Sequence, residues 1–147
     1  MSKFIFLLFS LTLLSCSVKK GIVTVKHTDL PEPIGPYSHS TNYENLIFVS
    51  GQIGLDQKTN SLKPGIEEQT VQIFENLKII LLDNNSDFEH ITKTTIFIAD
   101  MKHFEIVNKI YSRYFRNRFP ARSTIEVASL PRSASIEIEC IAVKKGR

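Results

Sequence analysis

The segment that most constrains the fold is residues 135–144, SIEIECIAVK. Successive side chains of an extended strand point to opposite faces, so this segment presents two sets of residues. One face carries Ile136, Ile138, Cys140 and Ala142, and the other carries Glu137, Glu139, Ile141 and Val143. Because both faces contain apolar residues, we expect helices to cover one side of the sheet and another subunit to cover the other.

The rest of the chain predicts further strands and two amphipathic helices. Strands are expected at residues 22–27, 46–50, 91–98 and 123–128, with Gly51 ending the second of them. The first helix should begin near Glu67 and present a stripe of Val71, Phe74, Leu77, Ile80 and Leu81. The second should run from about Lys102 to Phe115 with a stripe of Phe104, Val107, Ile110 or Tyr111, and Tyr114.

This order of elements predicts a single α+β domain. The order is β-β-α-β-α-β-β, with a short extra strand around residues 38–43 as an option, and both helices should pack on one face of a mixed sheet. A chain of 147 residues has room for one such core. The formal net charge of +3 is too small to indicate nucleic-acid binding.

The N-terminus has the pattern of an exported lipoprotein. Lys3 precedes an apolar run at residues 4–14, and the run ends in Leu13-Leu14-Ser15-Cys16, which resembles a bacterial lipobox. We therefore expect a signal peptide at residues 1–15 and a lipidated Cys16 with a tether at residues 16–21. The domain would occupy residues 22–147. The protein would be anchored on the periplasmic side of a membrane, or be cytoplasmic if the signal is not used. The alternative is an apolar strand or helix of the fold.

Cysteine and histidine usage offers no metal site. Neither an H-x-x-x-H nor a C-x-x-C spacing occurs, and we expect most of the four histidines to be exposed. Cys140 lies within an apolar strand, where a buried structural thiol is expected rather than a nucleophile.

Three features have side chains or backbone suited to chemistry on a small acid. Arg122 stands where a loop enters a strand and offers a planar fork to a carboxylate. Glu137 begins the last strand, and a hairpin through Pro131 is expected to place it beside Arg122. Tyr37 follows a Pro- and Gly-rich loop, and Gly51 allows close backbone approach to a ligand. For each side chain alone, a surface or structural role is the simpler interpretation.

Taken together, four motifs resemble the Rid (YjgF) family of imine deaminases. They are Ile34-Gly35-Pro36-Tyr37, Ser50-Gly51-Gln52-Ile53, Phe119-Pro120-Ala121-Arg122-Ser123 and Ile136-Glu137-Ile138-Glu139. The resemblance implies a chorismate-mutase-like fold of the bacillary type, assembled as a homotrimer with three sites in the clefts between subunits.

The resemblance also implies a reaction and its residues. Members hydrolyse reactive 2-imino or 2-enamino acids, such as 2-iminopropanoate or 2-iminobutanoate, to 2-oxo acids and ammonia, without a cofactor or metal. Arg122 would bind the substrate carboxylate and Glu137 would position the water and transfer protons. The Thr124 amide, the Gly51 backbone and Tyr37 would contact the ligand. Thr124 replaces a cysteine of the archetypal members, so cysteine-based regulation is not expected.

Two other functions are compatible with the same sequence. A non-catalytic trimeric protein could hold a small carboxylate with the same Arg122, although Glu137 would add an unhelpful negative charge. An endoribonuclease could use Lys109, Arg113 and Arg116, which fall at helical spacing. No aromatic residues for base stacking are interleaved with that strip, so no nucleic-acid partner is expected.

Overall fold

The computed structural model describes residues 21–146. The expected signal peptide, Cys16 and most of the tether lie outside the described residues. Within the described part of the chain, neither helix has the length and apolar character needed to cross a bilayer.

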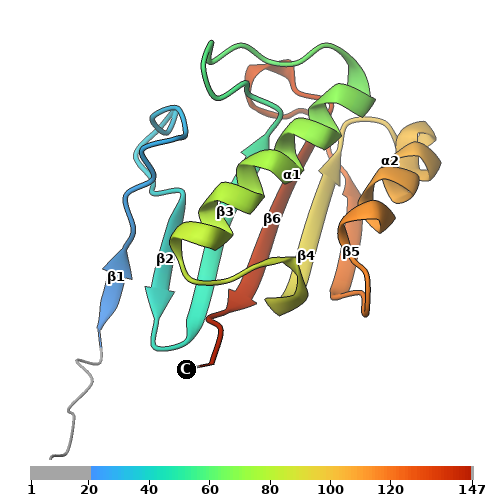
Figure 1. Cartoon of the computed structure of the whole chain (residues 1–147). Helices are drawn as coiled ribbons and strands as arrows, with labels where there is room; N and C mark the ends of the chain where they lie inside the picture. The colour runs from blue at the N-terminus through green and yellow to red at the C-terminus, as the bar shows by residue number, and fades with distance from the viewer. Residues whose placement is uncertain (1–20, 147) are drawn as a thin grey trace, which may run out of the picture.

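One mixed sheet with two helices on the same face forms the domain (Figure 1). The strands are β1 Ile22–Thr24, β2 Ser40–Tyr43, β3 Leu46–Ile53, β4 Ile91–Ile98, β5 Ala121–Glu126 and β6 Ile136–Val143. The helices are α1 Gly65–Asp83 and α2 Phe104–Tyr111. The strand order is β1-β2-β3-β6-β4-β5, and only the β4–β5 pair is parallel. The predicted α+β class is confirmed, and β2 supplies the optional extra strand.

Strand β6 occupies the centre of the sheet, as its two-sided pattern predicts. Ile136, Ile138, Cys140 and Ala142 are buried beneath the helices, and the alternate residues are half-buried on the helix-free face. Burial raises the pKa of the Cys140 thiol to about 12, so this thiol has little nucleophilic thiolate at neutral pH. Leu46, Phe48 and Ile125 remain exposed, so the helix-free face presents apolar side chains beside Glu137 and Glu139.

The predicted stripe of α1 is wrong at one position. Val71 is 39% exposed, whereas Ile73 is fully buried beside Phe74. Residues three apart on an α-helix are separated by about 60° less than a full turn around the helix axis. A stripe chosen only from residues three apart therefore rotates away from the buried face. Ile73 lies closer to the centre of that face.

Strand β3 does not end at Gly51 but continues to Ile53. Its register against β6 shifts between Val49 and Gln52, so one extra residue is accommodated as a β-bulge at Ser50 and Gly51. The glycine therefore shapes the strand instead of stopping it.

The expected hairpin between the last two strands is also wrong. β5 pairs in parallel with β4, which is joined to it through α2, and β6 inserts on the other side of β4. A strand–helix–strand unit with a parallel pair satisfies the hydrogen bonds of β4 and β5 without the hairpin. As a result, Arg122 on β5 and Glu137 on β6 are not neighbours.

Candidate active site

Glu137 stands in a hollow of about 450 Å³ formed by the upper ends of β3 and β6 and two loops. The lining residues are Ile34, Gly35, Pro36, Tyr37, Ser50, Gly51, Ile53, Pro131 and Glu137. We call this set the Glu137 half-site. Three of the residues predicted from the sequence, Tyr37, Gly51 and Glu137, are brought together here.

Gly51 makes room for the carboxylate. A Cβ added at Gly51 would lie only 1.7 Å from Oε1 of Glu137, so no other residue fits while Glu137 keeps this position. Burial raises the pKa of Glu137, and the nearby Glu139 raises it further. A carboxylate with a raised pKa accepts a proton more readily than an ordinary glutamate does, as a general base requires.

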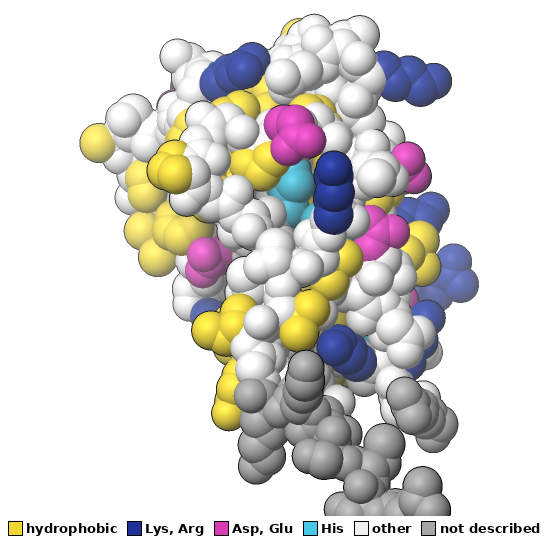
Figure 2. Space-filling view, turned by 90° about the vertical axis from the view of Figure 1, so that its left-hand side faces the viewer, with side chains coloured by type: hydrophobic (Ala, Val, Ile, Leu, Met, Phe, Trp, Pro, Cys, Tyr) yellow, Lys and Arg dark blue, Asp and Glu magenta, His cyan; other side chains and the backbone are white. Residues whose placement is uncertain are grey.

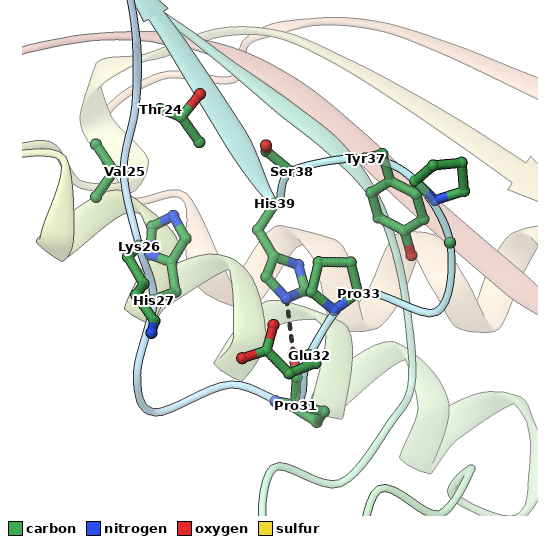
Figure 3. A pocket seen from close by; sticks show the side chains of 12 residues that line it. Thr24, Val25, Lys26, His27, Pro31, Glu32, Pro33, Tyr37, Ser38 and His39 are labelled. Carbon is green, nitrogen blue, oxygen red and sulfur yellow. Dashed lines mark hydrogen bonds between the residues drawn. The ribbon is translucent and has the colours of Figure 1, made fainter.

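The loop that carries Tyr37 is tied down from both sides. Nε2 of His39 donates to the carbonyl of Pro31 at 2.8 Å, closing the loop behind Tyr37 (Figure 3). The Ser50 hydroxyl donates to the carbonyl of Ser38 at 2.7 Å, joining the loop to the bulge of β3. The amide of Gln52 lies 3.4 Å from the other nitrogen of His39. These hydrogen bonds therefore fix the position of Tyr37 relative to Gly51.

A second hollow of about 450 Å³ lies behind the same loop and shares Gly35, Pro36 and Tyr37 with the Glu137 half-site. Lys26 and Glu32 extend at its rim, and His39 lies at its floor (Figure 3). In the space-filling view of this side, histidine is visible between acidic and basic side chains (Figure 2). The loop thus has open space on both sides, and its position depends on the His39–Pro31 hydrogen bond.

Arg122 lies in a separate hollow of about 430 Å³ between β5 and α2. The lining residues are Asn108, Tyr111, Ser112, Phe119, Pro120 and Arg122, and we call them the Arg122 half-site. The guanidinium carbon lies 4.8 Å from the centre of the Tyr111 ring and 5.8 Å from that of Phe104. These ring faces hold the cation without neutralising it, so its donors stay available for an anion.

The two half-sites lie on opposite faces of the sheet. Arg122 is in register with the buried Thr94 of β4, on the helix side, and Thr124 is in register with the buried Ile96. Glu137 is in register with Phe97, on the helix-free side. One chain therefore contains both predicted catalytic side chains but does not bring them together.

Asp83, His27 and Ser40 have the connectivity of a hydrolytic triad but not its accessibility. His27 donates from Nδ1 to Asp83 at 2.7 Å, and its Nε2 lies 2.9 Å from the Ser40 hydroxyl. Ser40 is only 1% exposed, and its oxygen already accepts from the Asn84 amide at 3.0 Å. The group therefore ties β2 to the end of α1. The expectation of mostly exposed histidines is wrong, because this group buries His27 and the other three, His39, His90 and His103, are half-buried.

Among residues 21–146 no group of three or more His, Cys, Asp or Glu side chains is arranged to hold a metal ion. Cys140 is a free, buried thiol, as the sequence predicts.

Sequence reasoning missed the platform beneath Arg122. Tyr111 was predicted only as a core residue of a helical stripe, and Asn108 and Ser112 were not singled out. Tyr111 is buried, yet one ring face contacts the guanidinium while its hydroxyl pairs with Thr94 at 2.9 Å. The signal that could have found it is its position three residues after Asn108 and next to Ser112, a polar pair that lies four residues apart on one side of the helix.

Comparisons with known proteins agree with the motifs. The model of the family described as Endoribonuclease L-PSP matches residues 27–144. The mouse 2-iminobutanoate/2-iminopropanoate deaminase is 42% identical over 132 residues, covering 89% of this chain and 96% of the mouse protein. The crystal structure of the E. coli YjgF gene product is 37% identical with a TM-score of 0.79, covering 84% of this chain and 99% of that one. E. coli TdcF with bound serine is 31% identical with a TM-score of 0.80, covering 84% of this chain and 99% of that one.

Proposed function

This chain belongs to the Endoribonuclease L-PSP family, which includes the Rid proteins, and we propose that it hydrolyses reactive 2-imino acids to 2-oxo acids and ammonia. The observation that carries the proposal is the presence, in one chain, of two separate half-sites with complementary chemistry. One presents an unneutralised Arg122 and the other a Glu137 whose pKa is raised by burial. Extensive identity to a named imine deaminase supports the same reaction.

Arg122 binds the carboxylate of the substrate. Its planar fork forms two parallel hydrogen bonds with a carboxylate, which fixes both the position and the orientation of the adjacent imine carbon. The ring of Tyr111 holds the guanidinium plane from one side. The backbone at Thr124, two residues along the same face of β5, is proposed as a further contact.

Glu137 positions the attacking water and transfers its protons. As a carboxylate it accepts a proton from water while the oxygen adds to the imine carbon, and it passes that proton to the imine nitrogen, which gives a neutral carbinolamine. It then accepts the hydroxyl proton of the carbinolamine and passes it to the amino nitrogen, so the C–N bond breaks and ammonia leaves as the carbonyl forms. The imine carbon is already electrophilic, so positioning is the main contribution required of the protein and no cofactor enters the scheme.

The walls of the Glu137 half-site suit a short apolar substituent on the substrate. Ile34, Pro36, Ile53 and Pro131 contribute aliphatic surface, and the ring of Tyr37 closes one side. These residues favour substrates the size of 2-iminopropanoate and 2-iminobutanoate.

A complete site requires a second copy of the chain. We propose a homotrimer in which Arg122 of one subunit faces Glu137 of its neighbour across a cleft. The exposed Leu46, Phe48 and Ile125 on the helix-free face supply apolar surface for such an assembly. The placement of Arg122 and Glu137 on opposite faces supports this arrangement over a site within one chain.

The test is imine hydrolysis by residues 17–147. 2-Iminopropanoate is generated in situ, and its loss is followed by competition with semicarbazide. We expect the wild type to accelerate the loss, Arg122→Ala to abolish the effect and Glu137→Gln to depress it. A folded wild-type protein that gives no acceleration would exclude the deaminase and favour a protein that only binds small carboxylates.

RNA cleavage is the second activity to test, because the family description names an endoribonuclease. Lys109, Arg113 and Arg116 are exposed near the end of α2, as the sequence strip requires. A single-stranded RNA substrate incubated with wild type and with a triple Lys/Arg→Ala variant distinguishes this activity. RNA cleavage that is lost in the triple variant but retained in Arg122→Ala would show that the protein is a ribonuclease that uses these basic residues.

We further propose that residues 1–15 act as a signal peptide and that Cys16 is lipidated, placing the domain on the periplasmic side of a membrane. The support is the sequence pattern alone. The full chain, expressed in a diderm bacterium with labelled palmitate, should incorporate label and sediment with membranes. Cys16→Ala should remove both properties. Unlabelled wild-type protein in the cytosolic fraction would instead indicate that the signal is not used.

A further inference from the structure

Gln69, in the first turns of α1, connects two loops beside the Glu137 half-site. Its side chain is buried, with 3% of the residue exposed. The amide nitrogen donates to the carbonyl of Lys63 at 3.0 Å, and the amide oxygen accepts from the backbone N–H of Ser135 at 2.8 Å. The two partners are 72 residues apart in sequence, and Gln69 contributes one hydrogen bond to each.

Ser135 controls the entry into β6. It is the last residue before that strand, and its carbonyl accepts from the N–H of Ala99 at 3.0 Å. Glu137 follows two residues later. The Gln69 oxygen and the Ala99 amide therefore fix the backbone from which the catalytic carboxylate extends.

The turn just before Ser135 needs support from outside. Arg132 and Ser133 have φ values of 54° and 57°, a left-handed conformation that residues with a Cβ adopt with strain. Pro131 of the same turn lines the Glu137 half-site. The hydrogen bond from Ser135 to Gln69 anchors the end of this turn. It therefore also helps to fix Pro131, which lines the pocket.

Gln69 itself is held against the opposite loop. A Cβ at Gly54 would lie 2.5 Å from Cα of Gln69, which shows that the helix and this loop pack in direct backbone contact. Next to the contact, Ile53, Leu55 and Ala134 form a small buried cluster. This packing fixes the backbone of Gln69, so its side-chain amide is held in place to bind Ser135.

We infer that Gln69 is a positioning residue of the proposed imine hydrolysis, acting through Ser135 to place Glu137 and Pro131 over Gly51. This inference rests on the proposed function. The chemistry of an amide is required, because one atom must donate to Lys63 and the other must accept from Ser135. Glutamate would turn a second acceptor toward the Lys63 carbonyl, and leucine would leave both backbone groups without their partner.

The test compares Gln69→Leu and Gln69→Glu with the matched control Gln72→Leu. Gln72 lies one turn further along α1, where its amide bonds only to Asn76 at 2.9 Å. For Gln69→Leu we expect kcat to fall by about tenfold to a hundredfold, as for a catalytic group displaced by roughly an ångström. KM should change less than kcat, because Arg122 and its platform are untouched and Pro131 is one of several apolar residues that line the pocket. Gln69→Glu should retain an intermediate kcat, and Gln72→Leu the wild-type kinetics.

A second readout separates positioning from loss of stability. Once β6 is released, Glu137 becomes better solvated, so the acid limb of the kcat/KM profile should move to lower pH in Gln69→Leu. Titration of the Glu137 carboxyl by carbon-detected NMR should show the same shift without any turnover. Wild-type kcat and an unmoved titration in folded Gln69→Leu would overturn the inference. If wild type itself does not turn over imines but the titration shifts, the proposed function fails while the positioning role stands.

Discussion

Arg122 and Glu137 lie on opposite faces of one sheet, with strand β4 between the strands that carry them. Arg122 points toward α2 and the Tyr111 ring, whereas Glu137 faces away from the helices above Gly51. In the proposed trimer, a substrate that contacts both side chains would lie between two copies of the chain. The first prediction tests this relationship directly.

Two impaired variants, Arg122→Ala and Glu137→Gln, should regain activity when mixed. In a trimer that contains Arg122→Ala and Glu137→Gln chains, some clefts combine the intact Arg122 of one chain with the intact Glu137 of the other. Random equimolar assembly should give about a quarter of the wild-type sites, since each site draws one residue from each of two chains. The measurement is imine hydrolysis after the two variants are unfolded and refolded together.

The control is the double variant Arg122→Ala/Glu137→Gln refolded with Arg122→Ala. No cleft in that mixture contains both residues, so its activity should stay at background. If the complementing mixture also stays at background while forming trimers, both residues act from the same chain and the intersubunit site is wrong.

The pH profile should report the raised pKa of Glu137. Only the carboxylate accepts a proton, so kcat/KM should decline as the pH falls through a pKa above that of an ordinary glutamate. Glu139→Gln removes the neighbouring negative charge, and the acid limb should move to lower pH. If the acid limb of the kcat/KM profile does not move in Glu139→Gln, the group that titrates there is not Glu137.

The contribution of Glu137 to folding stability should depend on pH in the opposite sense to its contribution to kcat/KM. A raised pKa means that the folded state favours protonated Glu137, so its stabilising contribution is present in acid and is lost as the pH rises through the folded pKa. At neutral pH, Glu137→Gln should therefore unfold at a higher temperature than wild type. Thermal unfolding at neutral and acidic pH should show the two proteins converging in acid.

Gly51→Ala should impair catalysis without unfolding the protein. The added methyl overlaps the end of the flexible Glu137 side chain, which can rotate away while the backbone of the bulge remains. We expect kcat to fall by about a hundredfold, comparable with loss of a general base. Gly21→Ala, where a Cβ meets nothing within 4 Å, is the matched control. Wild-type kcat in Gly51→Ala would show that Glu137 need not occupy this position.

The central strand and the fold class could be predicted because they depend on local patterns. The two-sided alternation of β6 requires cover on both faces, and the two apolar stripes require helices packed on one of them. Such patterns depend on residues close in sequence, and tertiary packing agrees with them here. Val71 shows the limit, because an apolar residue on the flank of a stripe resembles a core residue in the sequence, and the packing of α1 on the sheet decides that it is exposed.

The relation between Arg122 and Glu137 could not be predicted because it depends on strand order. A short connection around Pro131 is compatible with a hairpin, but it is equally compatible with a strand that crosses to the far side of β4. The pairing is decided by the parallel β4–α2–β5 unit, whose partners are distant in sequence. Gln69 was missed for a related reason, since its value lies in two backbone partners brought together only by the fold.

The aromatic platform should matter for substrate affinity. Tyr111→Leu removes the ring face beneath Arg122 and should raise KM by about threefold to tenfold, as expected for a cation–π contact of roughly 1 kcal/mol. Tyr111→Phe keeps the ring and loses only the hydrogen bond to Thr94, so it should cost about 1 kcal/mol of stability and leave KM near wild type. Equal KM values for the two variants would mean that the ring face does not position Arg122.

The His39–Pro31 hydrogen bond should set how well the Tyr37 loop closes the pocket. The bond closes a loop with open space on both sides, so His39→Ala should let Tyr37 move. We expect KM to rise by roughly threefold to tenfold, which corresponds to a net hydrogen bond of about 1 kcal/mol, with a smaller change in kcat. His39→Gln can still donate to Pro31 and should recover most of the affinity, whereas His90→Ala, whose ring pairs with Asp87, controls for the loss of an imidazole elsewhere. If His39→Gln is as impaired as His39→Ala, the imidazole has a role other than donating to Pro31. If neither variant is impaired, the loop is held mainly by the hydrogen bond between Ser50 and Ser38.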